Sequence, residues 1–164
     1  MYQRIVVPLD GSKLAEEALP DAERLARLMD APMHLLRVVD LTQLPWYGQF
    51  GGAMEYVASE QALAADDEAA ASYLQTVAER MTASGLSVVT EVRRGPTSRV
   101  LIAATRPGDL IVMASHGRSG MTRWFLGSVA EEILRHASVP ILLVKAPEQE
   151  IARVEAALAT ANAT

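Results

Sequence analysis

The chain has 164 residues, about the length of one domain and enough to bury a substantial core. Its 20 acidic and 15 basic residues give a net charge of −5, which argues against broad electrostatic attraction to nucleic acid or anionic lipid. The sequence has no cysteine, which excludes disulfides, thiolate metal sites and cysteine nucleophiles. No apolar run approaches the ~20 residues of a membrane span and the first residues do not resemble a secretory signal, so we expect a cytoplasmic protein.

Five short runs rich in valine, isoleucine and leucine recur along the chain, at residues 4–9, 33–39, 86–92, 109–114 and 139–144. Most of them lack the polar alternation of a half-exposed strand. Continuous apolar runs of this length are typical of strands that are covered on both faces. The runs therefore predict five strands of a buried, parallel sheet.

The segments between these runs have helical spacing. Residues 12–30 predict a helix with a kink or an early turn at Pro20. We expect its inner face to carry Leu14, Ala18, Ala22, Leu25 and then either Leu28 or Met29.

Residues 55–84 predict a long alanine-rich helix that ends at Gly85. Its expected inner face carries Leu63, Ala70, Leu74, Val77 and Met81. Two shorter helices are predicted, one with Pro96 at its first position and one over residues 128–137. The glycines of residues 42–53 predict a long loop that covers a site.

Strand and helix alternate along the whole chain. This pattern predicts an α/β fold of three layers, a doubly wound sandwich in which a five-stranded parallel sheet of order 3-2-1-4-5 carries helices on both faces. We expect one domain over residues 1–146 and a C-terminal helical tail over residues 147–164.

Two strand-to-helix loops have the composition of a ligand-binding site. They are "PLDGS" at residues 8–12 and "ASHGRSGMTRWFLGS" at residues 114–128. In an open parallel sheet, ligands bind at the carboxyl ends of the strands, where the strand order reverses. Glycines and the free N–H groups of a helix start bind anions there. The alternative is that Ser128 and Glu131 form a capping box that serves only the helix.

The usual nucleotide motifs are missing. The chain has neither a Gly-x-x-x-x-Gly-Lys-Ser/Thr run nor a Gly-x-Gly-x-x-Gly run after a strand, which argues against a P-loop NTPase and a standard dinucleotide fold. The second loop instead resembles the nucleotide-binding pattern of the universal stress protein family: Gly, two residues, Gly, nine residues, Gly, Ser or Thr. Here the matching positions are Ala114, Gly117, Gly127 and Ser128, with alanine in place of the first glycine.

The resemblance covers about residues 2–145, including "VPLDGS", "DLIVMASHG", "LGSVAEEIL" and "VPILLV". Resemblance to the ATP-binding branch of that family implies that Asp10 lies near the sugar and phosphates, and that the backbone of Val39 forms hydrogen bonds with adenine. It implies a first wall of Pro8, Gly11 and Ser12. The implied second wall consists of Met113, Ala114, His116, Gly117, Arg118, Gly127, Ser128 and Val129.

The function implied is that of an ATP-binding stress-response or regulatory protein, which acts through nucleotide occupancy with at most slow hydrolysis. Magnesium, if used, arrives with the phosphates and contacts Asp10, since the three histidines are too scattered for a metal site. Two alternatives stay open: a dimeric scaffold of the same family without nucleotide, and an ATP-pyrophosphatase-type enzyme, whose Ser-Gly-Gly-x-Asp-Ser loop is "LDGSKL" here. We also expect a homodimer built on the last strand.

Overall fold

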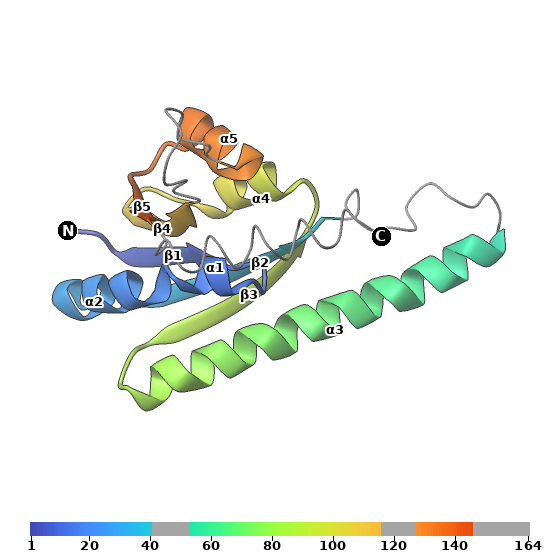
Figure 1. Ribbon diagram of the computed structural model, residues 1–164, viewed down its shortest axis with the longest axis horizontal. Coiled ribbons are helices and arrows are strands. Elements are labelled where there is room, and N and C mark those ends of the chain that lie inside the picture. The colour runs from blue at the N-terminus through green and yellow to red at the C-terminus, as the bar shows by residue number, and fades with distance from the viewer. Residues whose placement is uncertain (41–52, 116–126, 146–164) are drawn as a thin grey trace, which may run out of the picture.

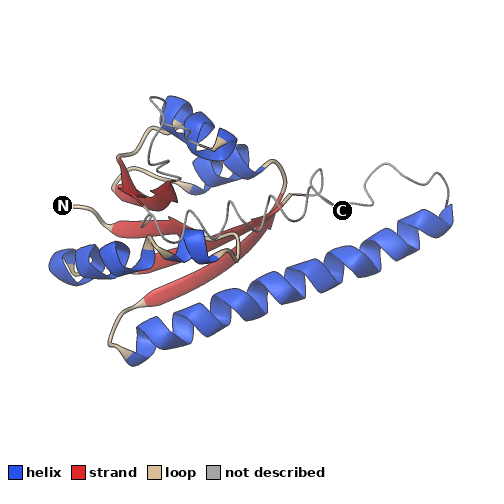
Figure 2. Cartoon of the chain, viewed as in Figure 1, coloured by secondary structure: helices blue, strands red, loops and turns tan. Residues whose placement is uncertain are grey.

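The computed structural model describes residues 1–40, 53–115 and 127–145 (Figure 1). Strands and helices alternate (Figure 2). Their order is β1 Arg4–Pro8, α1 Lys13–Glu16, α2 Leu19–Met29, β2 Met33–Val39, α3 Ala53–Ala83, β3 Val88–Arg94, α4 Thr97–Ala104, β4 Asp109–Ser115, α5 Ser128–His136 and β5 Ile141–Lys145. The predicted loop up to residue 52 and the predicted tail lie outside the described residues.

The sheet has the predicted architecture. Its strand order is β3-β2-β1-β4-β5, and every neighbouring pair is parallel. Helices α1, α2 and α3 cover one face and α4 and α5 the other (Figure 1). The fold prediction of a doubly wound, three-layer sandwich is therefore confirmed. Within the described chain, no helix has the length and apolar character needed to cross a membrane.

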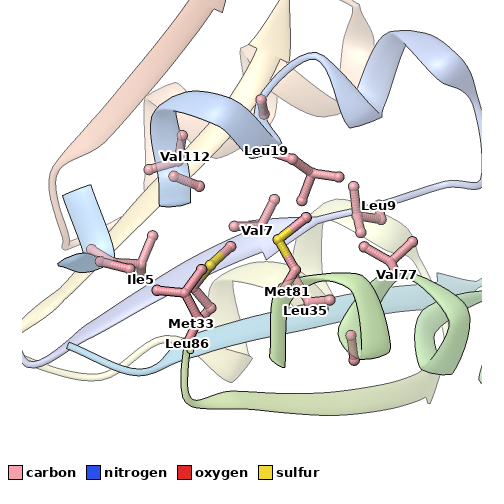
Figure 3. Close-up of a cluster of buried hydrophobic side chains, with 14 of the residues drawn as sticks. Ile5, Val7, Leu9, Leu19, Met33, Leu35, Val77, Met81, Leu86 and Val112 are labelled. Carbon is pink, nitrogen blue, oxygen red and sulfur yellow. The ribbon is translucent and has the colours of Figure 1, made fainter. Parts of the chain in front are cut away.

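Side chains of β1 alternate between two cores, as the period of two in a strand requires. Ile5 and Val7 point to the core beneath α1, α2 and α3, where Figure 3 shows them with Leu35 and Val77. Val6 lies in the other core, against α4 and α5. Because both faces are covered, the strand can be apolar throughout, which is why the continuous apolar run predicted a buried strand correctly.

The helix predicted after the first strand is two helices. α1 ends at Glu16, and α2 begins at Leu19, which places Pro20 in the first turn. A proline is tolerated there because the first N–H groups of a helix have no internal acceptor. Of the two candidates for the end of the apolar face, Met29 packs on the core and Leu28 is 72% exposed.

Several other boundaries differ from the prediction by one or two residues. Pro96 is the N-cap of α4 rather than its first helical residue. β5 begins only after Pro140, and β3 begins at Val88 and continues to Arg94. The predicted inner face of α3 is confirmed from Ala70 to Met81, and a left-handed Gly85 follows the helix.

A cluster of charged side chains crosses the sheet at the amino ends of β1 and β4. The Arg4 guanidinium donates to both carboxylate oxygens of Asp109, at 3.0 and 2.6 Å, and to Nδ1 of His34 at 3.0 Å. The Nε2 atom of His34 lies 2.9 Å from Glu91, which also accepts from Arg93. Arginine has no acceptor, so Nδ1 of His34 must accept and Nε2 must carry the proton.

This geometry keeps His34 neutral. Burial lowers the pKa of His34, and the neighbouring Arg4 lowers it further, against the opposing effect of Glu91. Burial opposes ionisation of Asp109, but hydrogen bonds from Arg4 and from the Arg106 N–H outweigh it and lower the pKa of Asp109. The stable cluster is therefore a neutral imidazole between two ion pairs.

We expect this histidine to make the fold less stable in mild acid. Its pKa is lower in the folded chain than in the unfolded chain, so the stabilisation is complete above the unfolded pKa of about 6.5 and is lost as the pH falls from there toward the folded value. Urea unfolding at several pH values between 8 and 5 should show the free energy of unfolding falling below pH 6.5. His34→Gln, which keeps one acceptor and one donor, should flatten that fall; an equal slope in both proteins would contradict the assignment.

Candidate functional site

A cavity of about 490 Å³ lies at the carboxyl ends of β1, β2 and β4, where the strand order reverses. It brings together nine of the residues implied by the sequence: Pro8, Asp10, Ser12, Val39, Met113, Ala114, Gly127, Ser128 and Val129. These come from three segments of the chain, and the first and last of them, at residues 8–12 and 113–129, are more than 100 residues apart. His116, Gly117 and Arg118 lie outside the described residues.

The loop from β1 to α1 is held by its own polar side chains. Asp10 Oδ1 accepts from the Ser12 N–H at 2.8 Å, and Ser12 Oγ accepts from the Ala15 N–H at 3.1 Å. Ser12 is thus the N-cap of α1. Both residues line the cavity and also fix the shape of its wall.

Gly11 has a structural reason to be glycine. Its φ of +88° lies in the left-handed region, and an added Cβ would lie 3.0 Å from Nη1 of Arg37. A side chain at this position would strain the backbone and displace Arg37. Gly11 therefore shapes the site, although it is not among the residues that line the cavity.

The end of β2 forms the next part of the wall. The Val39 carbonyl accepts from the Gly95 N–H at 3.1 Å, and the following carboxylate, that of Asp40, accepts from the N–H and the hydroxyl of Thr97, both at 3.3 Å. A carbonyl oxygen has two lone pairs, so the Val39 carbonyl keeps one acceptor site. Asp40 ties the end of β2 to the start of α4.

The start of α5 forms the opposite wall. Gly127 is the N-cap and has no side chain to cap the helix, and the first helical bond runs from the Glu131 N–H to the Gly127 carbonyl at 3.0 Å. The capping-box interpretation is wrong, because Ser128 is already inside the helix and the Glu131 carboxylate pairs with Arg135 at 2.6 Å. The N–H groups of Ser128 and Val129 have no acceptor within the helix, and both residues line the cavity.

Sequence reasoning missed several lining residues, among them Arg37, Asp40, Asp66 and Thr97. Arg37 carried a signal, since it is the one charge within the apolar run "MHLLRVV". Asp66 carried none, because its place depends on how α3 packs against the sheet. Among the described lining residues, Arg37 is the only basic one, and no described group of three or more side chains could hold a metal ion.

These features define a doubly wound α/β protein with a crevice at the switch point of its sheet. The model of the universal stress protein family matches residues 1–145. Universal stress protein MJ0531 of Methanocaldococcus jannaschii is 33% identical over 153 residues, covering 92% of this chain and 86% of that protein. The chain belongs to the universal stress protein family.

Two solved structures have the same fold. The structure of hypothetical protein MJ0577 is 25% identical with a TM-score of 0.68, covering 90% of this chain and 98% of that one. Universal stress protein UspA from Lactobacillus plantarum is 26% identical with a TM-score of 0.70, covering 87% of this chain and 97% of that one. The resemblance seen in the sequence motifs is confirmed at the level of the family.

Proposed function

We propose that the chain binds an adenine nucleotide, ATP first, in the cavity between the β1–α1 loop and the start of α5. The observation that carries this proposal is the N-terminus of α5, whose first N–H groups have no acceptor within the helix and whose first residues line a cavity within the usual ~300–1,000 Å³ of small-molecule sites. Ser128 and Val129 N–H groups would bind phosphate, and Asp10 would lie near the sugar. His116, Gly117 and Arg118 would complete the phosphate side, as the family pattern implies.

In this proposal the protein acts as a cytoplasmic regulator through nucleotide occupancy rather than rapid hydrolysis. Two of the carboxylates in the cavity already have partners in the fold, Asp10 with the Ser12 N–H and Asp40 with Thr97. One oxygen of each is engaged in the fold, and the described residues that line the cavity include no histidine to act as a general base for an attacking water. Magnesium would arrive with the phosphates, at Asp10.

The test is the nucleotide content of the protein itself. Protein purified without added nucleotide should release an adenine nucleotide when denatured, and chromatography with mass spectrometry would distinguish ATP, AMP and cyclic AMP. Protein that releases none and takes up none when incubated with ATP would favour the dimeric scaffold without nucleotide.

We also expect a homodimer through β5. This strand is at one edge of the sheet, and Leu142 on it is 38% exposed. Two edges can pair around a twofold axis, which closes the assembly at two chains. Light scattering should give twice the 17.7 kDa of one chain for the full-length protein, and twice the mass of the shortened chain after truncation behind Lys145. A stable full-length monomer at micromolar concentration would contradict the dimer. If that monomer aggregated once the tail was removed, the tail and not a second chain would be what covers β5.

A further inference from the structure

Arg37 occupies an unusual place for a charged residue. It belongs to the central part of the sheet, on β2, yet its half-buried side chain borders the cavity. Its guanidinium carbon lies 5.2 Å from the centroid of the Tyr73 ring, within the range of a cation–π contact. Among the described residues it makes no ion pair. The residue is therefore held by an aromatic ring and not by a carboxylate.

The ring beneath Arg37 is itself fixed. The Tyr73 hydroxyl donates to Glu16 Oε1 at 3.2 Å, and the other oxygen of Glu16 lies 3.3 Å from Arg80 and 3.7 Å from Lys13. Burial, and then the nearby Glu16, raise the pKa of Tyr73, so the phenol stays protonated and remains a donor. This chain of contacts joins α1 to α3 and orients the Tyr73 ring toward β2.

The position of Arg37 separates it from the proposed phosphate side. β1 lies between β2 and β4 in the sheet, and α5 follows β4 in the chain. Arg37 borders the cavity from β2, beside Gly11, on the opposite side of β1 from β4. A nucleotide that spans the cavity with its phosphates at α5 would have its base on the Arg37 side.

We propose that Arg37, held against Tyr73, stacks its planar guanidinium on the purine ring of the bound nucleotide and so positions the base. This inference rests on the proposed function. Arginine stacks on aromatic faces and on bases, whereas the compact ammonium of lysine cannot. Arg37 is then a positioning residue for the base, and its planarity matters more than its charge.

Calorimetric titration with ATP tests this with the full-length protein and two substitutions of Arg37. Arg37→Lys and Arg37→Gln should weaken ATP binding to a similar degree, about tenfold, which corresponds to about 1.4 kcal/mol. Lysine would restore a contact that depends on charge, so wild-type affinity in Arg37→Lys would overturn the proposal. A much larger loss in Arg37→Gln than in Arg37→Lys would also overturn it, because it would assign Arg37 to phosphate.

Tyr73 supplies the matched control. Tyr73→Phe keeps the ring and should bind ATP within about twofold of the wild type, whereas Tyr73→Leu removes the ring and should lose about as much affinity as Arg37→Lys. Equal affinity of both Tyr73 variants with the wild type would contradict the role of the ring. If the wild type binds no ATP, the proposed function is refuted. If the wild type binds ATP and the Arg37 variants bind it equally well, only this inference is refuted.

Discussion

Replacing Gly127 by valine is expected to weaken ATP binding by at least about 100-fold, because the side chain would block two charge-assisted N–H contacts worth ~1.5–3 kcal/mol each. An added Cβ at Gly127 meets no atom within 4 Å, so the branched side chain would project into open space beside the cavity. The backbone at Gly127 has a φ of −56°, which any residue adopts. Calorimetric titration with ATP is the measurement.

The fold should survive this substitution. Valine is a poorer N-cap than glycine, so we expect a stability loss of about 1 kcal/mol in urea unfolding. Ala83→Val is the matched control, since Ala83 is an exposed helix residue that does not line the cavity, and it should leave ATP affinity unchanged. A folded Gly127→Val protein with wild-type affinity would contradict the assignment of phosphate to α5.

Replacing Asp109 by alanine should destabilise the fold by about 3–5 kcal/mol, because removing one partner of a buried ion pair leaves the other charge uncompensated. Asp109 is 1% exposed and accepts from two nitrogens of Arg4 and from the Arg106 N–H. Its loss would leave these donors without their acceptor in the protein interior. Urea unfolding of the variant and the wild type measures the difference.

An exposed ion pair gives the contrast. Asp21 pairs with Arg24 across one turn of α2 at 3.2 Å, and the side chains are 40% and 73% exposed, respectively. Asp21→Ala should change the free energy of unfolding by less than about 1 kcal/mol. Equal losses in Asp21→Ala and Asp109→Ala would show that burial does not determine the effect.

The sequence predicted the sheet well because burial on both faces makes a strand continuously apolar. β1 and β4 are of this kind, and their positions were predicted within one residue. The strand predicted at residues 86–92 was placed less well, because β3 is an edge strand whose Val89 is 55% exposed. The helix starts near Pro20 and Pro96 differ from the prediction by one or two residues, and residue patterns do not fix a helix start more closely than that.

The parts of the cavity wall that come from strand-to-helix loops could be predicted from the residue types in those loops. "PLDGS" and the Gly127–Ser128 pair carry glycines and hydroxyls at strand-to-helix turns, and the structure places both at one cavity. The charge cluster around Arg4 was not predictable, because it joins β1, β2, β3 and β4 through contacts that depend on strand register. The capping box failed for the same kind of reason: its spacing was right, but α5 begins one residue earlier than the motif requires, with Gly127 and not Ser128 as the N-cap.

We expect the wild-type chain to bind ATP at one site formed by the β1–α1 loop and the start of α5. Calorimetric titration of nucleotide-free, full-length protein with ATP in magnesium buffer tests it most directly. Saturable binding of one ATP per chain is the expected result. The absence of any binding heat and of any shift in thermal stability at millimolar ATP would contradict it.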